Sequence, residues 1–160
     1  MMKNIILFLS LFIAHNAFAQ NNFVSKTLMP KFKFKDLTGK EYTQAHLPST
    51  YDFITIVYYD PGCEHCEDQA NRIKQELSRF SKTYFIWVTI GDAGQALIFK
   101  NYYFARSKNI KFLTDPTNSI FYTFAGIQET PTIWVYNKKK ELIATIPGPV
   151  DANIVYQYYH

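Results

Sequence analysis

Apolar positions follow two different periods along this chain, and the changes between them mark the elements of an α/β domain. Residues 51–59 and 84–90 are apolar, β-branched or aromatic almost throughout, which predicts two strands that are covered on both faces. Between them, apolar residues recur at steps of three and four from Cys66 to Phe80. This spacing predicts a helix from Cys63 to about Phe80 with one buried stripe.

Shorter patterns on either side complete the predicted order. A β-hairpin is predicted at 32–43, with a glycine-containing turn at 36–40. After residue 90 the expected elements are a helix at 94–107, a strand at 110–113, a helix from Asp115-Pro116 to Gly126, a hairpin over 133–146 and a short helix within 150–160. Since strands alternate with helices and the chain ends in a hairpin, we expect an α/β fold. Its mixed central sheet is flanked by helices and extended by the N-terminal hairpin.

The first residues have the pattern of an export signal. A basic start precedes the apolar run Ile5–Ile13, and Ala17–Ala19 provides the small-x-small pattern that signal peptidase recognises. We therefore expect residues 1–19 to be a signal peptide, cleaved before Gln20, and residues 20–160 to form a single domain. The apolar run is about half the 20 residues that a transmembrane helix needs, so the mature protein is expected to be soluble and not to span a membrane.

Composition limits the partners of the chain. The formal net charge is only +4, and no basic cluster is interleaved with stacking aromatic residues, so we expect no nucleic-acid partner. Aromatic residues make up 18% of the chain, which fits an aromatic core or a hydrophobic groove for partners equally well. The motifs of α/β-hydrolases, P-loop proteins and zinc proteases do not occur in the sequence.

The most informative chemical feature is the pair Cys63 and Cys66, the only cysteines of the chain. They follow an apolar strand and open a predicted helix, where backbone N–H groups and the helix dipole stabilise a thiolate. A disulfide that closes so small a loop contributes little stability, so a reversible redox pair is favoured over a structural disulfide. We predict that Cys63 is the attacking thiol, that Cys66 one turn deeper is the resolving thiol, and that no cofactor is needed beyond this redox-active disulfide.

The two residues between the cysteines are predicted to tune them. His65 favours the Cys63 thiolate when it is protonated or donates a hydrogen bond. Glu64, together with Glu67 and Asp68, opposes the thiolate through like-charge repulsion. The direction of the redox reaction therefore stays open at the level of the residues alone.

The dithiol and three further features resemble the thioredoxin-like superfamily, and most closely the exported TlpA/ResA-type thiol–disulfide oxidoreductases of bacterial envelopes. These features are the hairpin with the turn 36–40, the segment Thr130-Pro131-Thr132 before the predicted strand at 133, and the closing hairpin. The resemblance implies a thioredoxin-like fold and disulfide exchange with protein thiols, with a reductase or interchange direction favoured. It also implies a membrane or envelope redox partner and a periplasmic location.

The same resemblance assigns roles to Thr130 and Pro131. It implies that the Thr130–Pro131 peptide bond is cis, that this loop faces the dithiol, and that the Thr130 backbone pairs with the substrate chain. The sequence departs from the thioredoxin pattern at Gly62, where Trp is usual, and at Val57, where a buried Asp is usual. Proton transfer to the resolving thiol therefore needs another group, such as Glu64, Glu67, water or an acid elsewhere in the fold.

Three other interpretations use the same segment. A Cu(I)- or Zn(II)-binding thioredoxin-like envelope chaperone would bind its metal with both cysteines and with His46 or His65. A peroxiredoxin is disfavoured, because Ile56 and Asp60 stand where its Pro and Thr/Ser would be. A module that only docks a partner would leave the dithiol idle.

Overall fold

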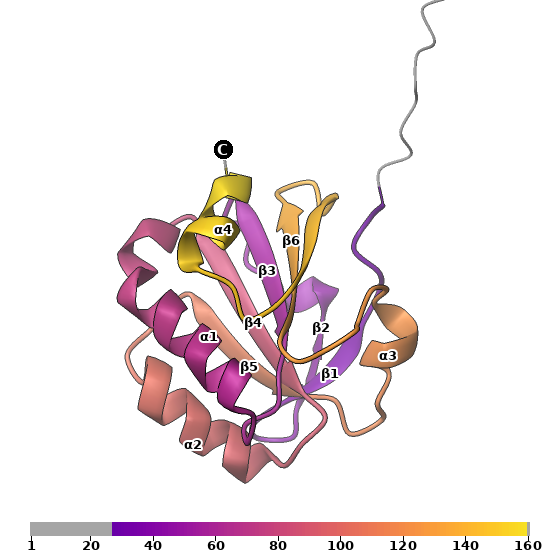
Figure 1. The fold of residues 1–160 in the computed structure, drawn as a ribbon. Helices are drawn as coiled ribbons and strands as arrows, with labels where there is room; N and C mark the ends of the chain where they lie inside the picture. The colour runs from indigo at the N-terminus through magenta and orange to yellow at the C-terminus, as the bar shows by residue number, and fades with distance from the viewer. Residues whose placement is uncertain (1–26, 160) are drawn as a thin grey trace, which may run out of the picture.

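A seven-stranded mixed sheet organises residues 27–159, the part of the chain that the computed structural model describes (Figure 1). Across the sheet the strands are β2 (Glu41–Thr43), β1 (Lys33–Asp36), β5 (Ile110–Thr114), β4 (Thr83–Thr89), β3 (Phe53–Tyr58), β6 (Thr132–Asn137) and β7 (Leu142–Pro147). β3, β4 and β5 are parallel, whereas β1, β2, β6 and β7 pair with their neighbours in antiparallel fashion. The predicted α/β class, mixed sheet and N-terminal hairpin are thus confirmed. The predicted signal peptide, residues 1–19, lies outside the described residues.

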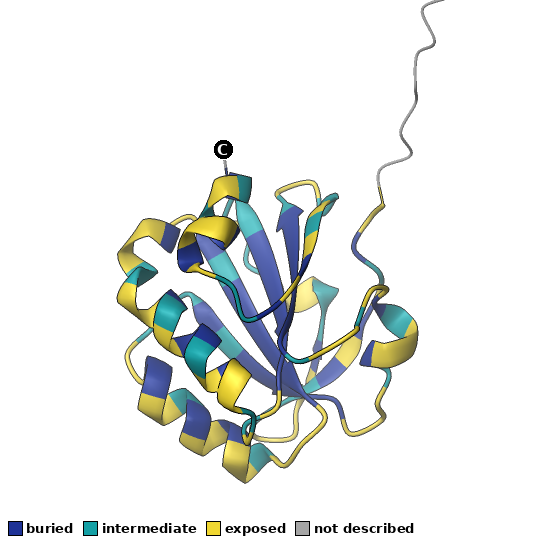
Figure 2. Cartoon of the chain, viewed as in Figure 1, coloured by how far each residue is buried: buried dark blue, intermediate teal, exposed yellow. Residues whose placement is uncertain are grey.

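Helices cover both faces of this sheet and enclose two cores. α1 (Glu64–Gln75), α2 (Ala93–Phe104) and α4 (Ala152–Tyr156) pack on one face, and α3 (Ile120–Thr123) packs on the other (Figure 1). The side chains of β3 alternate between the cores, because Val57 joins the first and Ile56 and Tyr58 join the second. Figure 2 shows the central strands buried along most of their length, as their continuous apolar sequences predict. Within residues 27–159, no helix has the length and apolar character needed to cross a bilayer.

The helix that carries the dithiol is shorter than predicted. α1 ends at Gln75, and a separate 3-10 turn, η2 (Leu77–Phe80), takes the place of its last turn. Glu76 has φ −107° and ψ 14°, outside the helical range, and it ends the helix. The 3-10 turn still directs Phe80 into the core, so the predicted apolar stripe is buried although the helix does not continue through it.

The helix expected at Asp115-Pro116 also begins later than predicted. α3 starts at Ile120, because the buried Asp115 carboxylate organises the preceding loop instead of capping a helix beside it. It accepts hydrogen bonds from the Thr117 backbone at 3.3 Å, the Ser119 hydroxyl at 3.0 Å and the Ile120 backbone at 2.7 Å. The predicted cap residue is therefore important, but for a loop rather than for the first turn of a helix.

Strand pairing decides which loops meet at the dithiol. β6 runs antiparallel to β3, and Tyr58 at the end of β3 lies opposite Thr132 at the start of β6. The segment that follows β3 must therefore lie beside the segment that precedes β6. The chain after Tyr58 holds Cys63, and the chain before Thr132 holds Thr130 and Pro131.

Candidate active site at the dithiol

A tight turn presents the two cysteines at the start of α1. The backbone N–H of Gly62 donates to the Asp60 carboxylate at 2.9 Å, and the N–H of Cys63 donates to the Asp60 carbonyl at 3.2 Å. Cys63 is then the N-cap residue of α1, half-buried, while Cys66 lies one turn further along with no exposed surface. The helix geometry thus places one thiol at the mouth of the site and the other behind it.

The loop before β6 closes over the first thiol. The Thr130 hydroxyl lies 3.7 Å and its carbonyl oxygen 3.8 Å from Cys63 Sγ. The Thr130–Pro131 peptide bond is cis, as the resemblance to the thioredoxin-like superfamily implies. The two cysteines lie 3.5 Å apart and are both free thiols. Cys63, Cys66 and Thr130 therefore form one compact cluster.

The surroundings of Cys63 favour its thiolate. Partial burial opposes the charged form, but the Cys66 backbone N–H, the Thr130 hydroxyl, the Cys66 side chain and the His65 backbone N–H all stabilise it. Their combined effect holds the pKa of Cys63 below its ordinary value. These groups are therefore the ones that would stabilise the predicted thiolate at the start of the helix.

The surroundings of Cys66 favour its protonated form. Burial raises the pKa of the Cys66 thiol to about 12, although the Asp60 backbone N–H, 3.4 Å from Cys66 Sγ, works in the opposite direction. The adjacent Cys63 side chain adds to the increase. Val57, on the strand before the dithiol, is fully buried and provides no acid there.

Two residues behind the dithiol were missed by the sequence analysis. Gln69 is fully buried on α1, and its side-chain oxygen accepts the Val150 backbone N–H at 2.8 Å. The Gly148–Pro149 bond is a second cis peptide, and the Gly148 N–H donates to the Pro131 carbonyl at 2.9 Å. A Cβ on Gly148 would lie 3.1 Å from Pro131 Cγ, so only glycine fits without displacement. The run Pro147-Gly148-Pro149 was the available signal for this close contact.

Of the predicted tuning residues and possible metal ligands, two lie beside the dithiol and one lies far from it. Glu64 and His65 are both exposed beside the dithiol. His46 lies next to β2 at the far edge of the sheet, where its ring accepts the Thr43 backbone N–H at 3.0 Å. Within residues 27–159, no three His, Cys, Asp or Glu side chains are grouped to hold a metal ion. His46 is therefore not part of the cluster around Cys63.

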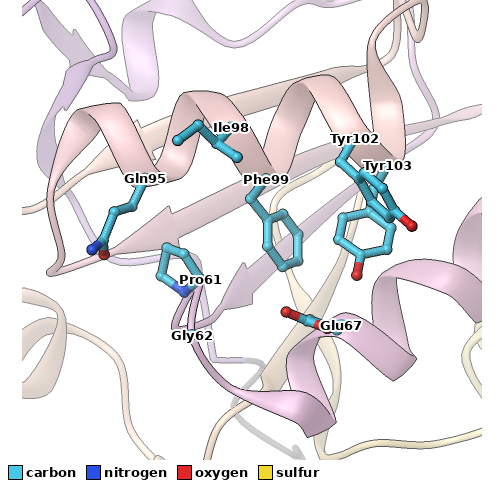
Figure 3. Close-up of a pocket in the computed structure, with 8 residues that line it drawn as sticks. All are labelled: Pro61, Gly62, Glu67, Gln95, Ile98, Phe99, Tyr102 and Tyr103. Carbon is cyan, nitrogen blue, oxygen red and sulfur yellow. The ribbon is translucent and has the colours of Figure 1, made fainter.

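A groove opens next to the dithiol, between the loop that follows β3 and helix α2 (Figure 3). Its volume is about 420 Å³. The residues that line it are Pro61, Gly62, Glu67, Gln95, Ile98, Phe99, Tyr102 and Tyr103. Sequence analysis left a hydrophobic groove open as a possibility, and α2 provides the apolar side of this one.

Solved structures of other proteins have the same arrangement of elements. A thioredoxin-like protein from Aeropyrum pernix gives a TM-score of 0.66 at 9% identity, over 81% of this chain and 88% of its own. The fold is thioredoxin-like. A putative thiol:disulfide interchange protein DsbE from Chlorobium tepidum gives a TM-score of 0.66 at 16% identity, over 84% of this chain and 94% of its own.

A third similar structure is a secreted disulfide oxidoreductase from Mycobacterium tuberculosis, described as homologous to E. coli DsbE. It gives a TM-score of 0.61 at 17% identity, over 79% of this chain and 92% of its own. No protein-family model matches the chain, and no curated protein matches it in sequence. At these identities the similarity shows only that the fold is thioredoxin-like. One of the structures with this fold is described as a disulfide oxidoreductase and another as a putative thiol:disulfide interchange protein.

The hydrogen bond from Thr130 leads to a prediction about pH. Replacing Thr130 by valine keeps the shape of the side chain but removes a donor to the Cys63 thiolate, so the pKa of Cys63 should rise. The loss of a hydrogen bond of about 1 kcal/mol corresponds to an upward shift of about 0.7 pH units. The midpoint of iodoacetamide alkylation against pH should move upward by that amount.

Thr145→Val, at an exposed threonine of β7, is the control for this measurement. Alkylation reports Cys63 alone up to high pH, because Cys66 is buried and its pKa is about 12. An unchanged midpoint in Thr130→Val would show that the hydroxyl does not stabilise the thiolate.

Proposed function

We propose that this protein is an exported thiol–disulfide oxidoreductase that exchanges disulfides with protein thiols through Cys63 and Cys66. The observation that carries the proposal is the pairing, within 3.5 Å, of one thiol with a lowered pKa and one with a raised pKa. A thiol that ionises easily at the mouth of a site is suited to attack, and a protonated thiol behind it is suited to resolve.

In the reducing direction the reaction has two steps. The Cys63 thiolate attacks one sulfur of a substrate disulfide, which forms a mixed disulfide and releases the other substrate sulfur as a thiolate. The Cys66 thiolate then attacks Cys63 Sγ, which forms the Cys63–Cys66 disulfide and releases the second substrate thiolate. Two electrons and two protons pass from the dithiol to the substrate.

The mixed disulfide itself prepares the second step. Burial is the main reason that the pKa of Cys66 is high, but the neighbouring Cys63 side chain contributes to it. Once Cys63 Sγ is bonded to the substrate it carries no charge, so this contribution is lost and Cys66 ionises more easily. Cys66 thus becomes reactive after Cys63 has attacked.

We assign the proton of Cys66 to the substrate thiolate that leaves in the first step. Of the two carboxylates considered from sequence, Glu64 is exposed to solvent, and Glu67 interacts with the Tyr103 hydroxyl in the groove. That thiolate is released beside the site at the moment when Cys66 becomes easier to ionise, so it can accept the proton as Cys66 attacks.

For the direction and location we keep the proposal drawn from the sequence. We propose a TlpA/ResA-type protein of the bacterial periplasm, acting as a reductase or interchange enzyme and supplied with electrons by a membrane or envelope redox partner. One similar structure is a secreted disulfide oxidoreductase and another is a putative interchange protein, which supports this class.

The equilibrium reduction potential of the Cys63–Cys66 pair tests this function. We expect a value near or below about −250 mV when the mature protein is titrated against dithiothreitol or glutathione. A potential above about −180 mV would make the protein an oxidant or isomerase and overturn the proposed direction. The absence of any reversible dithiol–disulfide couple would overturn the proposed function.

The Cu(I)- or Zn(II)-binding alternative stays a prediction without a supporting observation. It needs a third ligand beside the two cysteines, and His46 lies across the sheet while His65 is exposed. Metal that stays bound after purification in chelator-free buffer would support the metal-binding alternative.

A further inference from the structure

The groove beside the dithiol has an apolar side that nothing in residues 27–159 covers. On α2, Ile98 is 71% exposed and Tyr102 is 72% exposed, whereas the neighbouring Phe99 and Tyr103 are buried. Figure 3 shows Phe99 directed from α2 toward Glu67 on α1 with the two tyrosines beside it, while Ile98 lies along α2. Large apolar side chains exposed next to a reactive group are typical of an interaction site.

The opposite side of the groove carries a negative charge. Glu67 on α1 is the only side chain in the lining with a formal charge, and none of the salt bridges within residues 27–159 includes it. On the same helix Arg72 pairs with Asp68 at 2.9 Å, and Lys74 lies two helical turns, or about 11 Å, beyond Glu67. Its ammonium group donates to the Tyr102 carbonyl and lies 5.7 Å from the centre of the Tyr102 ring.

The mouth of the site extends this negative charge. Asp60 and Glu64 are exposed on either side of Cys63, and the window 60–67 contains no Lys or Arg. The chain as a whole has a net charge of +4, so the region around the dithiol is locally opposite in sign. Such a patch attracts a partner with positive charge close to its own reactive group.

The groove continues the proposed substrate site. Pro61 and Gly62 line it, and Cys63 is the next residue in the chain. Cys63 also contacts Thr130 in the loop before β6, so both this loop and the groove adjoin the Cys63 segment. A polypeptide whose sulfur is bonded to Cys63 while its backbone lies along Thr130 would extend its flanking residues over Pro61 and Gly62.

From these observations we propose that the groove binds the segment of the protein substrate that flanks the reactive cysteine, and that it selects an apolar side chain together with a lysine or arginine. The apolar side chain packs against Ile98 and Tyr102, and the cation lies opposite Glu67. The inference rests on the proposed function, because it names the substrate class of the same dithiol.

Peptide mixed disulfides with thionitrobenzoate provide the test. Thionitrobenzoate is the better leaving group, so Cys63 attacks the peptide sulfur and the release of the dye reports the rate of the first step. One peptide carries leucine and lysine on both sides of its cysteine, a second replaces leucine by serine, and a third replaces lysine by glutamate. The mixed disulfide of mercaptoethanol with the same dye is the reference, because it is too small to reach the groove. Reduced full-length mature protein is used in a single turnover.

We expect the leucine–lysine peptide to react about five-fold faster, relative to the reference, than either altered peptide. Ile98→Ser and Tyr102→Ser should remove the preference for leucine, and Glu67→Gln should remove the preference for lysine over glutamate. Tyr122→Ser is the matched control, since Tyr122 is a tyrosine with 91% exposure on α3, on the other face of the sheet. Far-UV circular dichroism verifies that each variant is folded.

Three results would overturn the inference, and the first two are distinguishable from the third. If the reference is reduced but the three peptides react at equal relative rates, or if the preferences survive all three groove variants, the groove does not bind the flanking segment. The proposed function would stand in that case. If neither the reference nor any peptide is reduced, the proposed function itself fails and the substrate class fails with it.

Discussion

Cys63→Ser is expected to reduce the rate of disulfide reduction to the background of the assay, a loss of about 10³-fold or more. The reason is that the thiolate is the nucleophile, and the structure lowers the pKa of this thiol alone of the two. A serine hydroxyl in the same place stays protonated at neutral pH in spite of the same donors. The measurement is the release of a thiol reporter from a mixed disulfide under steady reduction by dithiothreitol.

The substitution should leave the fold intact, because Cys63 is half-buried at an N-cap position that serine favours. An unchanged melting temperature is therefore the control. Substantial activity in Cys63→Ser would contradict the assignment of the attacking thiol. A biological function that persists when both cysteines are replaced by serine would favour the module that docks a partner with an idle dithiol.

Cys66→Ser is expected to stop the reaction at the mixed disulfide. Cys66 lies 3.5 Å from Cys63, and a group held at such a distance reacts with an effective concentration of about 10⁵ M or more. Without it, release of the substrate depends on external thiols at millimolar concentration. The variant should lose most of its turnover while the first step continues, and a covalent complex with the substrate should accumulate on non-reducing gels.

The complex must disappear on treatment with excess dithiothreitol, and it must not form in a double variant that also lacks Cys63. A Cys66→Ser variant that turns over as rapidly as the wild type would show that Cys66 does not resolve the mixed disulfide. Together, the two serine variants separate attack from resolution, which the pKa directions of the two thiols predict.

The sequence was a good guide to the elements that have a strong local signal. The continuous apolar run at 51–59 correctly predicted the central strand β3, and the cysteines at the start of the next helix lie where the pattern placed them. The cis bond before Pro131 came from the resemblance to a known superfamily. Nothing in the local composition indicates it, since most bonds before proline are trans.

The features that were missed depend on contacts between distant parts of the chain. The end of α1 at Gln75 could not be predicted, because Phe80 remains buried whether it lies on an α-helix or on a 3-10 turn. The contact between Gln69 and Val150 joins residues that are far apart in the sequence. The groove arises only when α2 packs beside α1, so its lining residues have no shared sequence pattern.

The roles of Glu64 and His65 stay predictions. Both side chains are exposed, and only the backbone N–H of His65 contributes to the lowered pKa of Cys63. The effect of the acidic first turn therefore depends on ionic strength, since charges at the surface are screened by salt.

The short distance between the two thiols also determines how the protein would withstand peroxide. A half-buried thiol with a lowered pKa, such as Cys63, is the side chain that peroxide converts first to a sulfenic acid, while the buried and protonated Cys66 is spared. With Cys66 3.5 Å away, the sulfenic acid condenses to the Cys63–Cys66 disulfide with loss of water before a second oxidation reaches it. A disulfide can be reduced again, whereas sulfinic and sulfonic acids are in general permanent damage. The position of Cys66 behind Cys63 would thus preserve the site during oxidative stress.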